Sequence, residues 1–195
     1  MLERILEFDK YLFRNINSVF TNSFLDSIFP IWRESITWVP LYFFLLLFIF
    51  INFKNKCWYW FLLAILLPSF TDILSSRFIK DFIERPRPCQ DINLGFPVRL
   101  LLNRCPTSFS FTSSHATNHF GIAVFIFLTL KPFLGKYRWL FILWAASVSY
   151  GQVYIGVHYP LDILGGAMLG SFFGWLGYML FRKINTIYPS SVLTA

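Results

Sequence analysis

The chain is a series of long apolar stretches separated by short groups of charged residues. The apolar stretches cover about 39–53, 57–74, 116–131, 138–157 and 161–181, and basic residues lie between or after them. Several approach the roughly 20 residues that an α-helix needs to cross the hydrocarbon core of a bilayer. The pattern therefore predicts an all-α integral membrane protein, a helical bundle with five transmembrane helices over these stretches.

The first 33 residues follow a different pattern. Between residues 2 and 20, apolar positions recur at the spacing of one helical face, and charged residues lie between them: Glu3, Arg4, Glu7, Lys10 and Arg14. This pattern predicts an amphipathic helix that lies in the membrane interface. Residues 21–33 form a second short segment, which is either interfacial as well or completes a sixth crossing. We expect a single membrane-embedded domain over 1–195.

Composition agrees with this class. Hydrophobic residues make up 56% of the chain and charged residues only 14%, whereas soluble domains carry about 25% charged residues. The net charge of +7 would also suit a nucleic-acid-binding protein, but the charges flank apolar spans instead of forming one basic face. We therefore exclude nucleic acid as a partner and expect anionic lipid head groups.

The first of three polar clusters runs from Lys80 to Pro88. A solvated helix end with i,i+4 ion pairs accounts for some of its charges, but not for Arg87, which stands between Pro86 and Pro88. A guanidinium presents a planar fork of donors to phosphate, and Lys80 adds a compact charge. This cluster predicts an anion clamp.

The second cluster reads Thr112-Ser113-Ser114-His115 and precedes an apolar stretch. One of its hydroxyls can cap the helix that follows, and a helix N-terminus also binds anions. His119 lies one turn after His115 on the same face. Two histidines at this spacing also suit zinc, but the pattern of zinc proteases needs a Glu next to the first histidine, and Ala116 stands there.

The third cluster spans Gly151 to Asp162. Asp162 lies in the first turn of the last apolar stretch, where a carboxylate matches the helix dipole. It also follows His158 by four residues. A carboxylate at that spacing can accept the imidazole N–H and leave the other ring nitrogen free as a nucleophile. In the same stretch, Gly166, Gly170 and Gly174 predict close helix packing.

Together the clusters resemble the type 2 phosphatidic acid phosphatase family of membrane lipid phosphatases. The family's first motif is Lys, six residues and Arg-Pro, which Lys80, Arg87 and Pro88 match. Its second is Pro-Ser-Gly-His, of which Ser113 and His115 remain. Its third is Ser-Arg, five residues, His, three residues and Asp, and it reads here as Gly151-Gln152, His158 and Asp162.

The resemblance implies a bundle of usually six crossings and a mechanism without metal or cofactor. His158 would attack phosphorus and form a phosphohistidine, Asp162 would orient it, and His115 would protonate the leaving oxygen. The residues expected to hold the phosphate oxygens are Lys80, Arg87, Ser113, Ser114 and Gln152.

Three positions depart from the family pattern. Gln152 replaces an arginine that binds phosphate and brings no charge, unless Arg77, Arg85, Arg99 or Arg104 supplies one. Ser114 replaces glycine, so a Cβ crowds the approach of phosphate to the backbone. His119 lies outside the motifs, and is either a packed polar residue or an accessory to His115.

The resemblance leaves several substrates open. We expect a lipid head-group phosphate, with the 1-phosphate of lipid A first, because the second motif and the loop cysteines look like the bacterial lipid A 1-phosphatase branch. Undecaprenyl pyrophosphate, phosphatidylglycerol phosphate and phosphatidic acid are the alternatives. A lipid-binding or transport protein without catalysis is the alternative of another class.

The family places its site at the outer face of the cytoplasmic membrane of a bacterium, and we expect the loop over 85–109 to face that side. The basic residues alone do not decide the orientation, because both sets of loops carry them. In an oxidising compartment Cys89 and Cys105 would form a disulfide; otherwise they stay as free thiols. Cys57 is expected to be an inert core thiol.

Overall fold

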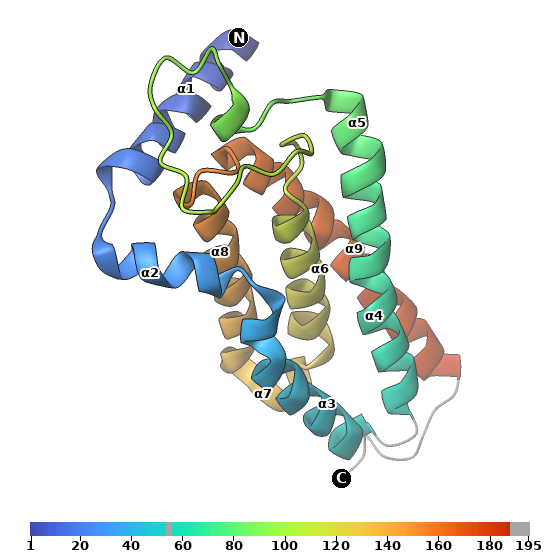
Figure 1. The fold of residues 1–195 in the computed structure, drawn as a ribbon. Helices are drawn as coiled ribbons and strands as arrows, with labels where there is room; N and C mark the ends of the chain where they lie inside the picture. Colours follow the sequence, from blue (N-terminus) through green and yellow to red (C-terminus); the bar gives the residue numbers. More distant parts are fainter. Residues whose placement is uncertain (54–55, 188–195) are drawn as a thin grey trace.

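The computed structural model describes residues 1–53 and 56–187, and the regular structure in these residues is entirely helical (Figure 1). The helices of the main bundle are α3 (Val39–Phe53), α4 (Cys57–Ile73), α6 (Ser114–Thr129), α8 (Trp139–Tyr154) and α9 (Pro160–Ile187). A π-helical segment, Leu74–Ile79, joins α4 to the short α5 (Lys80–Ile83). The five main helices coincide with the five apolar stretches, and the predicted all-α class is confirmed.

The five main helices differ in length, and only some are long and apolar enough to cross a membrane by themselves. The predicted number of five to six crossings stays a prediction. Within the described residues, three helical stretches are long and apolar enough to cross a membrane: Ser35–Phe53, Cys57–Ile83 and Pro160–Ile184. A fourth is counted if Ser114–Thr129 and Lys131–Tyr154, which meet at a 71° bend, form one span. Helices α6 and α8 have 16 residues each, or about 24 Å at 1.5 Å per residue. They are short because α6 begins, and α8 ends, at polar clusters.

Helix α6 is central, and its closest partner is α9. A Cβ added to Gly170 would collide with the carbonyl oxygen of Thr117, and one added to Gly174 with that of Gly121. The backbones of the two helices therefore approach closely, as predicted from the spacing of the small residues. At the upper end of this contact the Ser113 amide donates to the Asp162 carbonyl oxygen at 3.1 Å. Glycine packing thus brings the start of α6 against the start of α9.

The N-terminal helices lie at the same end of the bundle as the long loop 84–113 (Figure 1). Helix α1 (Leu2–Arg14) buries Asp9 and Phe13, and Phe13 packs against Tyr159 with ring centroids 5.3 Å apart. Other large apolar residues of the helix stay exposed, among them Leu2, Ile5, Phe8 and Tyr11. These exposed apolar side chains suit the interfacial position predicted for α1.

Helix α2 (Ser23–Trp32) is ten residues long, or about 15 Å. It lies across the bundle (Figure 1) and ends before the stretch that crosses. The structure of residues 21–33 therefore fits the interfacial alternative and not a completed sixth crossing.

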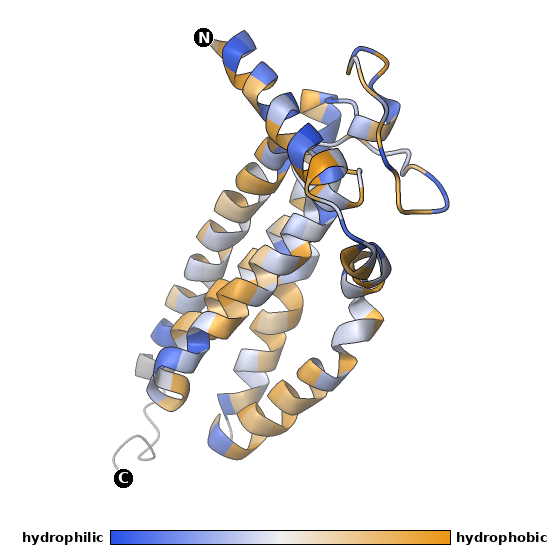
Figure 2. Cartoon of the chain, turned by 90° about the vertical axis from the view of Figure 1, so that its left-hand side faces the viewer, coloured by the Kyte–Doolittle hydropathy of each residue, from blue (hydrophilic) through white to orange (hydrophobic). Residues whose placement is uncertain are grey.

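A disulfide lies at one end of the molecule, and a group of basic residues lies at the other. Cys89 and Cys105 are bonded within the loop, with Cα atoms 6.0 Å apart, and Cys57 is buried and free. At the far end lie basic residues that close the helices; Lys54 is outside the described residues. Figure 2 shows hydrophilic residues at both ends and an apolar band between them. The described residues at the far end are Lys56, Lys131, Lys136, Arg138, Arg182 and Lys183.

Candidate active site

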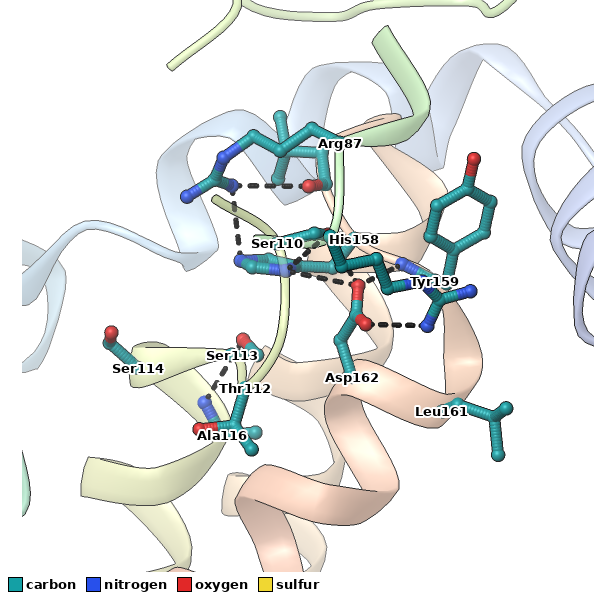
Figure 3. A network of polar contacts seen from close by, with 12 residues as sticks. Arg87, Ser110, Thr112, Ser113, Ser114, Ala116, His158, Tyr159, Leu161 and Asp162 are labelled. Carbon is teal, nitrogen blue, oxygen red and sulfur yellow. Dashed lines mark hydrogen bonds and ion pairs between the residues drawn. The ribbon is translucent and has the colours of Figure 1, made fainter. Parts of the chain in front are cut away.

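The three polar clusters meet at the end of the bundle that carries the long loop. Arg87 comes from the loop, Ser113 from the start of α6, and His158 and Asp162 from the turn before α9 and its first residues (Figure 3). His115 lies in the first turn of α6. Lys80 lies at the start of α5, and its side chain is only 4% exposed. Residues that lie up to 82 positions apart in the sequence therefore come together at one end of the bundle.

The carboxylate of Asp162 is the centre of this network. It is fully buried and accepts hydrogen bonds at both oxygens. Oδ2 accepts from Ser110 Oγ at 2.5 Å and from the Tyr159 amide at 2.8 Å, and Oδ1 accepts from Arg85 Nη1 at 2.7 Å. A buried carboxylate is stable only when it is paired and hydrogen-bonded, and these contacts meet both conditions.

His158 is held between a carboxylate and a guanidinium. Its Nδ1 lies 3.5 Å from Asp162 Oδ2, and its Nε2 lies 3.1 Å from Arg87 Nη1. A guanidinium nitrogen only donates, so the contact with Arg87 makes Nε2 the acceptor and places the ring proton on Nδ1, toward Asp162. Burial lowers the pKa of His158 to about 4, even though Asp162 favours the protonated ring. The geometry therefore supports a neutral imidazole with a lone pair at Nε2.

Two buried cations near His158 have no carboxylate partner among the described residues. Arg87 donates to the Ser108 carbonyl oxygen at 2.7 Å, to Ser108 Oγ at 2.9 Å and to the Val157 carbonyl oxygen at 3.1 Å. Burial lowers its pKa to about 10, still well above neutrality. Lys80 makes no hydrogen bond or ion pair within the described chain. Uncompensated buried charges of this kind are costly, and an anionic ligand would neutralise them.

The start of α6 positions the second cluster. Ser113 is the N-cap, and its Oγ accepts from the Ala116 amide at 3.4 Å. Ser114 turns away from His158, and its hydroxyl meets that of Ser76 at 2.9 Å. The His115 ring forms no side-chain hydrogen bond within the described residues, and the Nδ1 of His119 meets the His115 carbonyl oxygen at 2.8 Å.

Most of the remaining predicted residues lie outside the hydrogen-bond network around His158. Gln152 is fully buried, and both atoms of its amide lack a hydrogen-bond partner in the described chain. Arg77 is exposed. Arg99 is paired with Asp26 at 2.6 Å, and Arg104 is exposed in the loop. None of these three arginines joins the network around His158.

Arg85 and two residues that the sequence reasoning missed complete the network. Arg85 bridges Asp162 and Asp9, its Nη2 lying 2.5 Å from Asp9 Oδ2. Asp9 also accepts from the Leu161 amide at 2.8 Å. A signal for Asp9 existed, since it stands four residues from both Ile5 and Phe13 on the apolar face of its helix. Ser110, the other residue missed, lies in the irregular loop and has no such signal.

The described residues contain no group of three or more His, Cys, Asp and Glu side chains arranged to hold a metal ion. His115 and His119 stack with centroids 6.2 Å apart, and no third ligand joins them. The site is therefore a group of buried cations around an imidazole that a carboxylate orients. This is an arrangement that can bind an oxyanion and present a nucleophile to it.

Comparisons with known proteins give a consistent result. Residues 58–186 match the family model described as the PAP2 superfamily. The lipid A 4′-phosphatase of Bacteroides thetaiotaomicron is 32% identical over 193 residues, covering 95% of this chain and 82% of the relative. The lipid A 4′-phosphatase of Porphyromonas gingivalis is 32% identical over 182 residues, covering 92% and 75%.

Two solved structures share the fold. Aquifex aeolicus LpxE aligns with a TM-score of 0.65 and 30% identity, covering 87% of this chain and 93% of that one. The PAP2-type phosphatidylglycerolphosphate phosphatase of Bacillus subtilis aligns with a TM-score of 0.69 and 24% identity, covering 96% and 89%. The second likeness supports the fold alone.

Replacement of Asp9 by Ala should destabilise the protein. It leaves Arg85 with one carboxylate and the Leu161 amide without its acceptor, and loss of one partner of a buried pair costs about 3–5 kcal/mol. We expect the lower end, because Asp162 still faces Arg85. Thermal unfolding in detergent would measure the change, with Glu7→Ala, exposed on the same helix, as the control. Equal melting temperatures of the two variants would contradict the account.

The imidazole of His158 should titrate near pH 4. Because its folded pKa lies below 6.5, the unfolded chain binds the proton more readily, so stability from this group is lost as pH falls from about 6.5 toward 4. NMR of ¹³C-labelled histidine in micelles would follow the ring, with the signal assigned by its disappearance in His158→Asn. A midpoint at or above 6.5 would show that the ring is not held as described.

Proposed function

The chain belongs to the PAP2 superfamily, and from that premise we propose that it is a lipid A phosphatase that removes the 4′-phosphate. The observation that carries the proposal is the buried series of contacts from Asp162 through His158 to Arg87. Lys80, buried nearby, has no ion-pair partner among the described residues. The substrate rests on the two lipid A 4′-phosphatases that align with nearly the whole chain. These relatives favour the 4′ position over the 1-phosphate expected from the sequence.

The proposed reaction begins with attack by His158 on phosphorus. The Nε2 lone pair forms a bond to phosphorus while the bond from phosphorus to the lipid oxygen breaks. Arg87, which lies 3.1 Å from Nε2, moves its hydrogen bond onto a phosphate oxygen as the substrate enters. Asp162 accepts the Nδ1 proton in a hydrogen bond and stabilises the positive charge that develops on the ring.

The other residues handle the protons and the oxygens. His115, protonated, gives its proton to the leaving lipid oxygen, and the neutral ring then takes a proton from water, which attacks the phosphohistidine and releases phosphate. Lys80, Arg87 and the amides at the start of α6 hold the phosphate oxygens. Loss of one such donor typically costs about 10²–10³ in rate. Fixed cations of the protein neutralise the charge of the phosphate, so the mechanism as proposed uses no metal.

We further propose a location in the bacterial cytoplasmic membrane with the site on the outer side. The disulfide Cys89–Cys105 lies in the loop next to the site, and disulfides persist in oxidising compartments. The basic residues at the far end of the bundle would then face the cytoplasm, as the positive-inside rule expects.

Phosphate release from purified protein in micelles tests the proposal. We expect release from the 4′-monophosphate of lipid A to exceed release from the 1-monophosphate, undecaprenyl pyrophosphate, phosphatidylglycerol phosphate and phosphatidic acid. His158→Ala should lower it by at least about 10³-fold, because the covalent route is lost. Addition of a chelator should leave the wild-type rate unchanged.

Each contrary outcome has a definite meaning. Preference for the 1-phosphate would overturn the proposed position, and full activity in His158→Ala would overturn the nucleophile. Binding of lipid A without release of phosphate by the wild-type protein would favour a lipid-binding or transport role, the alternative that the uncharged Gln152 supports.

A further inference from the structure

A cationic pocket lies beside the proposed phosphate site. It has a volume of about 520 Å³ and lies between Arg33, which follows α2, and the loop segment 102–108. Arg33 and Arg104 bring positive charge to its wall, and Asn103, Thr107 and Ser108 bring neutral polar groups. No carboxylate lines it. Its chemistry is therefore that of a site for an anion.

Among the described residues, Arg33 has only one long ion pair, with an exposed carboxylate. Its side chain is 15% exposed, and its Nε is buried without a hydrogen-bond partner. The nearest carboxylate is that of Glu34, whose Oε1 is 4.0 Å from Nε and whose side chain is 57% exposed. An exposed pair of this length contributes little. Burial therefore lowers the pKa of Arg33, and an anion bound in the pocket would supply the missing charge.

The pocket is connected to the nucleophile through one residue. Ser108 lines the pocket, and its carbonyl and hydroxyl oxygens accept from Arg87 at 2.7 and 2.9 Å. Arg87 in turn lies 3.1 Å from His158 Nε2. Arg33 is near enough for its charge to act on Arg87, whose pKa it lowers. An anion in the pocket would thus lie close to a phosphate at His158.

The loop side of the pocket is fixed in place. Cys105 lines the pocket and is bonded to Cys89, which follows the Arg87-Pro88 pair directly. The disulfide therefore joins the wall of the pocket to the segment that carries Arg87. Arg104, next to Cys105, is exposed and makes no hydrogen bond or ion pair within the described residues, so its guanidinium is available at the entrance.

We propose that this pocket, the Arg33 subsite, binds a second phosphate of the substrate while the first phosphate is hydrolysed at His158. The inference rests on the proposed function in that it assumes a phosphorylated lipid at His158. Guanidinium forks and neutral donors suit the several oxygens of a phosphate group. The second phosphate can be on a distant sugar, as in a doubly phosphorylated acylated disaccharide, or directly linked to the first, as in a prenyl diphosphate.

The kinetics of matched substrates test the subsite. The first pair is lipid A with both phosphates and lipid A with the 4′-phosphate alone; the second is undecaprenyl diphosphate and undecaprenyl monophosphate. For wild-type protein we expect a lower KM for the substrate with two phosphates in the pair that the subsite serves. Arg33→Gln should raise that KM by about tenfold or more, because a hydrogen bond to a charged group is lost. It should change the KM of the one-phosphate substrate less than about twofold.

Two further variants make the result interpretable. Arg104→Gln, in the exposed loop, should raise the same KM to a smaller extent without affecting folding, and Arg33→Lys should retain part of the affinity. Arg4→Gln, on the exposed side of α1, is the control for loss of a single positive charge and should leave both KM values unchanged.

Failure of the subsite and failure of the proposed function give different results. If Arg33→Gln and Arg104→Gln act equally on one- and two-phosphate substrates, or on neither, the subsite is overturned whatever the lipid. If wild-type protein releases no phosphate from either form of lipid A, the proposed function fails. The prenyl pair then still tests the subsite.

Discussion

The buried carboxylate of Asp162 is the constraint on which the rest of the site depends. A carboxylate removed from water requires hydrogen bonds and positive charge around it, and the fold supplies both from separate parts of the chain. Ser110 comes from the loop, Arg85 from the segment after α5, and His158 from the turn before α9. Arg85 extends the network to Asp9 in α1. The loop and the N-terminal helix are therefore fastened to the bundle by the same group that orients the imidazole.

The membrane environment explains why this site is at the end of the bundle. Helices α6 and α9 approach closely through glycine, which brings their N-termini together with the free amides and dipoles that favour an anion. The cations that face this point, Lys80 and Arg87, are buried without carboxylate partners in the described chain. A lipid phosphate at the membrane surface can neutralise them while its apolar part stays among the helices. Helix α1 is joined to Asp162 through Arg85. At the interfacial position predicted for it, α1 would place the edge of the membrane next to the proposed chemistry.

The features that depend on local spacing could be predicted from the sequence. The apolar stretches gave the five main helices, and the three motifs gave Lys80, Arg87, Ser113, His115, His158 and Asp162, because each cluster marks the end of a helix. The place of Asp9 on the apolar face of its helix was a signal, but its partner, the Leu161 amide, lies 152 residues away and could not be predicted. Arg33 belongs to no motif and could not be predicted either. Both act through contacts between distant segments. Arg85, predicted only as an accessory, has a role fixed by its two carboxylates, and Gln152 is buried away from the hydrogen-bond network.

The central claim is that Asp162 holds His158 as a neutral nucleophile that becomes covalently phosphorylated. The most direct measurement is mass spectrometry of the peptide that contains His158, after incubation with lipid A and an alkaline quench, which preserves phosphohistidine. Wild-type protein quenched during turnover should carry phosphate on His158, and the His158→Ala variant should carry none. Phosphate on a different residue, or turnover by wild-type protein with no phosphate trapped on His158, would contradict the account.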